Sequence, residues 1–122
     1  MRFHTEGLER ARIYQQQHSQ FSMSVVTHFE VLRGLRAARA ARQEAVFAAF
    51  ANNTTIYPLT DAVFARAIDV YADLHRRGRL IADADLLIAC TALEHGMPIA
   101  TNNESHFSRI PGLRIDNWLR PS

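Results

Sequence analysis

Two aspartates stand at the start of an apolar run, where their side chains could serve metal or phosphate chemistry. Asp83 and Asp85 open the segment IADADLLIACTALE at residues 81–94, which Gly96 closes. As a helix, this segment carries both carboxylates near its N-terminus, where the backbone dipole favours anions. A helix so apolar belongs in a core, so we expect the two carboxylates at the rim of a buried element, where a cation or phosphate site can form.

Further oxygen-bearing side chains lie on two other segments. Glu30 follows a short apolar run, and Asn102, Asn103 and Glu104 follow another. Magnesium and manganese prefer hard oxygen ligands and keep several waters, so two or three carboxylates suffice for a site. A metal held there could activate water and neutralise a phosphodiester during hydrolysis.

Each of these side chains also has a structural interpretation. Thr27 and Glu30 match the capping-box pattern T-x-x-E, in which the hydroxyl caps a backbone amide and the glutamate reaches back to the cap residue. Asp83 can be the N-cap of its helix, and Asp85 can simply favour the helix dipole. The asparagines can shape a turn. Spacing alone therefore leaves both the metal site and the capping interpretation open.

Short apolar strands and amphipathic helices alternate along the chain and must position these side chains. We expect strands at residues 21–26, 54–59, 97–101 and 113–115. We expect helices at 5–18, at 27–50 with a break near 37–41, at 61–77 between Thr60 and Gly78, and at 81–94, with a helical turn within 102–111. This order predicts an α/β fold, a parallel sheet with helices on both faces, whose polar sites gather beyond the carboxyl ends of the strands.

Composition describes an ordinary globular chain and excludes several classes of protein. With 122 residues, 48% hydrophobic and 21% charged, we expect one domain over residues 1–122. No apolar stretch approaches the roughly 20 residues that span a bilayer, and the N-terminus lacks a signal peptide, which predicts a cytoplasmic protein without a membrane partner. The single cysteine, Cys90, should be a buried thiol. Zinc-binding histidine pairs, serine triads and phosphate-binding P-loops have no counterpart in the sequence.

Arginines stand near both acidic segments. All 14 basic residues are arginine, whose planar fork suits phosphate, although codon bias also explains such a composition. Arg33 and Arg36 follow Glu30 on the same expected helix and are candidates for binding a nucleic-acid substrate. A solvated helix face is the alternative interpretation.

Two blocks of the sequence resemble PIN-domain ribonucleases of the VapC toxin type. They are SVVTHFEVLRGL at residues 24–35 and LIADADLLIACTALEHGMPIATNNESHFSRIPGLRIDNW at residues 80–118. The resemblance implies a PIN-like α/β/α fold that hydrolyses RNA with Mg²⁺ or Mn²⁺ held by acidic side chains. It also implies a cognate antitoxin protein as partner and a homo-oligomer.

Matched position by position, the resemblance implies roles for individual residues. Glu30 and Asp85 would bind the metal, and Asp83 and Asn103 would support catalysis beside them. Thr101 would orient substrate or water.

The beginning of the chain departs from the family pattern. PIN domains of this type begin with a strand that ends in an aspartate, within D-T-N or D-T-D, and this sequence has neither. The expectation is therefore a single PIN-like domain over residues 1–122 that is N-terminally truncated and lacks the first family strand and its metal-binding aspartate. The remaining strands would then close up, a second chain would fill the defect, or residues 1–122 would be a fragment of a longer product.

Three functions follow as hypotheses. The first is a metal-dependent endoribonuclease of the VapC-like toxin class that hydrolyses RNA phosphodiesters. The second is a catalytically inactive PIN remnant that binds the antitoxin. The third is an α/β interaction domain in which all the carboxylates are helix caps.

Overall fold

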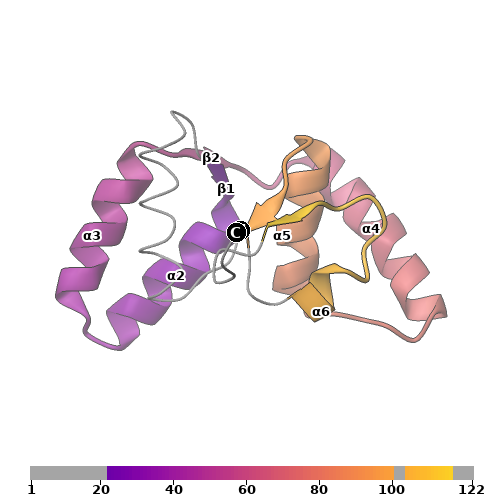
Figure 1. The fold of residues 1–122 in the computed structure, drawn as a ribbon, viewed down its shortest axis with the longest axis horizontal. Helices are drawn as coiled ribbons and strands as arrows, with labels where there is room; N and C mark the ends of the chain where they lie inside the picture. The colour runs from indigo at the N-terminus through magenta and orange to yellow at the C-terminus, as the bar shows by residue number, and fades with distance from the viewer. Residues whose placement is uncertain (1–21, 101–103, 117–122) are drawn as a thin grey trace.

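A computed structural model describes residues 22–100 and 104–116 of the chain (Figure 1). The predicted helix at 5–18 and the residues Thr101, Asn102 and Asn103 lie outside this described part. The elements, in chain order, are β1 (Ser22–Ser24), α2 (Val25–Ala37), α3 (Ala41–Asn52), β2 (Thr55–Tyr57), α4 (Asp61–Arg76), α5 (Asp83–Glu94), β3 (Ile99–Ala100), α6 (Glu104–Phe107) and β4 (Ile115–Asp116).

The strands pair in parallel, as the alternation of elements predicts. β1 pairs with β2, with Met23 opposite Ile56, and β3 pairs with β4, with Ile99 opposite Ile115. Within residues 22–100 and 104–116 these are two separate two-stranded sheets, so β1 and β3 have not closed up into one sheet. The Ser22 hydroxyl donates a hydrogen bond of 2.6 Å to the Met97 sulfur, which joins the β1 strand to the segment before β3.

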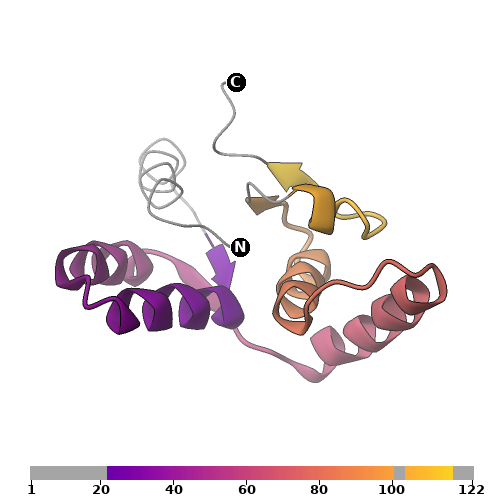
Figure 2. The same ribbon diagram turned by 90° about the horizontal axis from the view of Figure 1, so that it is seen from below.

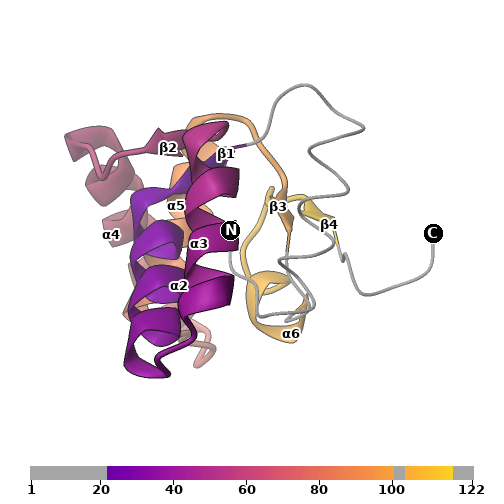
Figure 3. The ribbon, with the colours of Figure 1, turned by 90° about the vertical axis from the view of Figure 1, so that its left-hand side faces the viewer.

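The helices form two pairs that meet at α2 and α5. Helix α2 contacts both α3 and α5, and α4 packs against α5, so the α2–α3 pair and the α4–α5 pair lie on opposite sides of β1 (Figures 1 and 2). Strands β3 and β4 and helix α6 stand together on one side of these helices (Figure 3). Across the part of the chain that the structure describes, no helix is long and apolar enough to cross a membrane.

Helix α2 begins earlier than the sequence pattern suggests. The Ser24 hydroxyl accepts a hydrogen bond from the Val26 amide at 3.0 Å, so Ser24 is the N-cap and the helix starts at Val25. The predicted strand at 21–26 is therefore shorter, and the predicted capping box at Thr27 and Glu30 is wrong. Ser24 and Thr27 each carry a hydroxyl that could cap the helix. Ser24 is the cap because the extended backbone of β1 ends at that residue. The predicted break is confirmed, since Arg39 has a φ of 55° between α2 and α3.

Helices α4 and α5 begin in different ways. The Thr60 hydroxyl accepts from the Val63 amide at 3.2 Å, which confirms the predicted cap of α4. Helix α5 has Ala82 at its N-cap position, with no side-chain hydrogen bond to the cap. The interpretation of Asp83 as an N-cap is therefore wrong, because Asp83 lies inside the first turn together with Asp85. Neither aspartate therefore caps α5.

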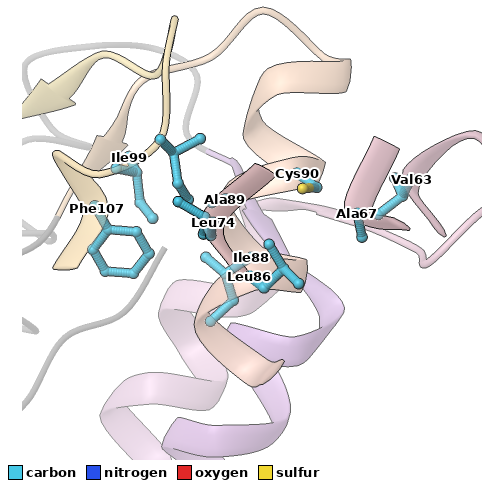
Figure 4. Close-up of a cluster of buried hydrophobic side chains, with 10 residues drawn as sticks. Val63, Ala67, Leu74, Leu86, Ile88, Ala89, Cys90, Ile99 and Phe107 are labelled. Carbon is cyan, nitrogen blue, oxygen red and sulfur yellow. The ribbon is translucent and has the colours of Figure 1, made fainter. Parts of the chain in front are cut away.

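Helix α5 is the centre of the larger apolar core (Figure 4). Its side chains Leu86, Ile88, Ala89 and Cys90 are buried with residues of α4, β3 and α6. A second cluster gathers Met23, Phe47 and Phe50 between β1 and α3. Cys90 is fully buried, as predicted, and desolvation raises the pKa of its thiol from 9.0 to about 11.

Candidate functional site

Asp85 is a carboxylate held almost entirely inside the protein. The residue is 1% exposed, in the first turn of α5, although its neighbours in the core are apolar. The N-terminus of a helix favours a negative charge there, but a buried carboxylate also requires a positive partner or a bound cation. The His106 ring on α6 supplies one neighbour, with its Nδ1 3.7 Å from the Asp85 Oδ2.

Asp83 stands in the same turn but faces the solvent. Residues two apart on an α-helix point about 200° apart, so the two aspartates cannot share one face. The structure accordingly exposes Asp83 and buries Asp85. Both carboxylates lie at the N-terminal rim of α5, with Asp83 on its outer face and Asp85 buried. Support of the site by Asp83 therefore stays a prediction.

Glu30 is the second carboxylate with a restricted environment. It lies on α2, with its side chain 10% exposed. The Arg33 Nη2 atom approaches the Glu30 Oε2 atom at 3.7 Å, and the Arg33 side chain stays 60% exposed. Because Ser24 caps the helix, Glu30 is not required as a capping residue. The partner of Glu30 on the next turn is the Arg33 guanidinium, which also reaches the solvent.

Thr27 adds a polar atom that the capping interpretation misplaced. It is fully buried, one turn before Glu30 on the same side of α2. Its Oγ1 atom finds no hydrogen-bond acceptor or donor in the described part of the chain. Buried hydroxyls are normally satisfied, so this atom is a candidate contact for a buried water near Glu30.

The two candidate substrate-binding arginines have different surroundings. The Arg36 guanidinium is engaged with α3, with Nε at 3.1 Å and Nη2 at 3.5 Å from the two Glu44 oxygens. Hydrogen bonding and the charge of Glu44 raise the pKa of Arg36. Arg33 instead lies against Glu30. Of the two predicted positions, Arg33 is therefore the one next to a proposed metal ligand.

The carboxylates of Glu30 and Asp85 suit a hard cation, and two other predicted members of the site lie outside the described residues. Helices α2 and α5, which carry Glu30 and Asp85, contact each other. Over residues 22–100 and 104–116, no three histidine, cysteine, aspartate or glutamate side chains come together as a metal-binding group. Magnesium is usually held by one or two carboxylates together with waters and substrate phosphates, so two carboxylates fit it. Asn103 and Thr101, which the resemblance places beside them, lie outside the described residues.

Sequence reasoning missed His106. The six histidines of the sequence do not have metal-ligand spacing, so none of them was predicted to lie at the site. Its place beside Asp85 depends on the α6 turn, whose position follows from packing of Phe107 in the core. The signal in the sequence was the pair of apolar residues Phe107 and Ile110 within a largely polar segment.

Comparison with known proteins matches residues 3–113 to the family model described as PIN domain. The chain is 35% identical over 96 residues to ribonuclease VapC1 of Methanocaldococcus jannaschii, covering 77% of this chain and 68% of that protein. It is 30% identical over 101 residues to the tRNA(fMet)-specific endonuclease VapC of Salmonella typhimurium, covering 82% of this chain and 76% of that protein. The structure is similar to DNA-bound VapBC from Salmonella typhimurium, with a TM-score of 0.80, 28% identity and coverage of 90% and 85% of the two chains.

Proposed function

The chain belongs to the PIN-domain family, and on that premise we propose that it is a metal-dependent endoribonuclease of the VapC toxin type. The observation that carries the proposal is the carboxylate of Asp85, buried in the first turn of α5 where no helix cap requires it. The names of the two relatives, a ribonuclease and a tRNA-specific endonuclease, support the reaction class.

Glu30 and Asp85 are the proposed ligands of a divalent cation, Mg²⁺ or Mn²⁺. When bound, such a cation supplies charge neutralisation at the phosphodiester and a more acidic water. Glu30 and Asp85 would hold the cation from helices α2 and α5, which contact each other and would limit the movement of both carboxylates. Asp83 and Asn103 support the site by accepting hydrogen bonds from waters or substrate.

The side chains beside these two carboxylates organise the site and its substrate. Arg33 can donate two hydrogen bonds to one phosphate while it stays near Glu30, because most of its side chain is exposed. His106 on α6 contacts Asp85 on α5 and helps to keep the carboxylate in place. Thr101 and Arg36 complete the proposed substrate contacts, and Arg36 must give up its Glu44 partner to reach RNA.

The test is cleavage of RNA by the purified chain with Mg²⁺ or Mn²⁺. Initiator tRNA is the first substrate to try, because a relative is named for it. Glu30→Gln and Asp85→Asn should each abolish cleavage and weaken Mn²⁺ binding measured by calorimetry. Glu94→Gln is the matched control, since Glu94 is also paired with an arginine, Arg66 at 2.9 Å, but on another surface. Unchanged cleavage in the Glu30 and Asp85 variants would reject the site.

A cognate antitoxin and a second copy of the chain are the proposed protein partners. The similarity to VapBC structures supports the antitoxin. Exposed apolar side chains on α4, Phe64, Ile68 and Tyr71, support self-association. Sedimentation of the chain alone and with antitoxin distinguishes the two, because a self-associating chain is larger than a monomer before antitoxin is added.

A catalytically inactive antitoxin-binding module is the second candidate. One observation favours it: the described residues contain no group of three metal-binding side chains. A module of this kind would bind the antitoxin tightly and cleave no RNA with either metal. Cleavage that depends on Glu30 and Asp85 would reject it.

A further inference from the structure

Phe29 is a large aromatic side chain that the fold leaves in solvent. It lies on α2 directly before Glu30, and it is 58% exposed. The neighbouring apolar residues of α2, Val31, Leu32 and Leu35, pack against the Met23, Phe47 and Phe50 cluster. Phe29 takes no part in that cluster, so its position is not explained by the core.

Arg33 connects the exposed ring to the candidate site. The Arg33 Cζ atom lies over the Phe29 ring at 4.9 Å from its centroid. The same guanidinium approaches the Glu30 carboxylate at 3.7 Å. Ring, guanidinium and carboxylate therefore form one continuous row on α2, with a cation–π contact at one end and an ion pair at the other.

We propose that Phe29 is a stacking platform for an unpaired base of the RNA substrate, with Arg33 beside it contacting the adjoining phosphate. The inference rests on the proposed function and names the form of its substrate. Base stacking on aromatic side chains and on guanidinium planes is a general way to hold single-stranded RNA. A base on the exposed part of the ring places its backbone next to Arg33, and through Arg33 next to Glu30.

The chemistry of this row favours RNA over an apolar peptide. The flat ring is accompanied by the guanidinium of Arg33, which stays 60% exposed beside Glu30, whereas Arg36 is paired with Glu44. The only other large exposed apolar residue of α2 is Val25. One ring beside an exposed guanidinium suits a base and its phosphate, whereas a peptide-binding surface requires a wider apolar area. Because bases in a duplex are covered by their neighbours, the platform selects an unpaired nucleotide at or beside the cleavage position.

Binding of a fluorescent RNA tests the platform directly. The probe is a short unstructured RNA that carries one 2-aminopurine, mixed with the full chain without added divalent cation so that cleavage does not proceed. Stacking on Phe29 should quench the 2-aminopurine fluorescence. Phe29→Ala and Phe29→Leu should lose the quench and bind at least about fivefold more weakly, whereas Phe29→Tyr and Phe29→Trp should retain both.

Leucine is the informative substitution. It keeps an apolar side chain of similar reach and removes only the aromatic face. If Phe29→Leu binds and quenches as the parent chain does, the platform is wrong. If Phe29→Leu keeps antitoxin affinity while Phe29→Ala loses it, and RNA binding is unchanged in both, the side chain is an apolar protein contact and the inference is overturned.

Kinetics separate failure of this inference from failure of the proposed function. With Mn²⁺, Phe29→Leu should raise KM with little change in kcat, because the ring holds substrate without touching the reacting atoms. Cleavage that requires Glu30 and Asp85 but is indifferent to every Phe29 variant would refute only the platform. A parent chain that neither binds nor cuts RNA would refute both. Because Phe29 is largely exposed, its substitutions should leave the circular dichroism spectrum unchanged.

Discussion

The start of helix α2 offers a direct test of whether Glu30 has a structural role as a capping residue. Two hydroxyls compete for the capping role, Ser24 and Thr27. In the structure, Ser24 accepts from the Val26 amide at 3.0 Å, whereas Thr27 is fully buried and its Oγ1 atom has no hydrogen bond within the described residues. Only Ser24→Ala should therefore lower stability, and Thr27→Val should not.

The magnitudes follow from these contacts. Loss of an N-cap hydroxyl costs about 1 kcal/mol, so Ser24→Ala should lower the free energy of unfolding by about that amount, or about 4 °C in Tm for a chain of this size. Thr27→Val keeps the shape of the side chain and removes an unsatisfied buried hydroxyl. Its free energy of unfolding should stay unchanged or rise by up to about 1 kcal/mol.

Urea denaturation followed by circular dichroism measures both variants. Thr60→Ala is the matched control, because Thr60 caps α4 through the same kind of hydrogen bond, 3.2 Å to the Val63 amide, and should also lose about 1 kcal/mol. A capping box at Thr27 and Glu30 would reverse the result. If Thr27→Val and Glu30→Gln each lost about 1 kcal/mol while Ser24→Ala lost nothing, Glu30 would be a structural residue and the site would lose a ligand.

Three further predictions concern the core, the arginines and the metal. The chain should become less stable as pH rises from 9 to about 11, because the unfolded Cys90 thiol ionises near 9.0 while the folded one holds its proton until about 11. Urea midpoints should therefore fall with pH across this range, and they should fall less steeply in Cys90→Ala. An equally steep fall in Cys90→Ala would contradict the assignment to Cys90. Arg33→Gln should weaken RNA binding in fluorescence anisotropy more than Arg36→Gln does, because Arg36 is already paired with Glu44; equal losses would show that the ion pair opens freely. Mn²⁺ should raise the Tm of the parent chain and not that of Asp85→Asn, because only binding to the folded state stabilises it; the same shift in both would place the ion elsewhere.

Local signals in the sequence predicted most of the elements correctly. Periodic apolar residues located the helices, Thr60 capped α4, and Gly78 and Gly96, with φ of 65° and 64°, follow the ends of α4 and α5. These features depend on residues within about one helical turn of one another, so a short stretch of sequence contains their cause. The buried thiol of Cys90 was predictable for the same reason, since apolar side chains surround it along the chain.

Choices between equivalent residues were not predictable from the sequence. Ser24 and Thr27 are both good caps, and only the point where β1 ends selects Ser24. The separation of the strands into two sheets was not predicted either, because strand pairing joins residues far apart in the chain.

The sequence by itself determined which residues could do chemistry here: carboxylates on two helices, an arginine near one of them, and a resemblance to metal-dependent ribonucleases. The tertiary structure decided which of them share an environment. It buried Asp85 and exposed Asp83, set His106 beside Asp85, paired Arg36 with Glu44, and left Phe29 in solvent next to Arg33 and Glu30. Burial and long-range contacts depend on how separate helices pack, and that packing has no counterpart in the spacing of residues along one helix.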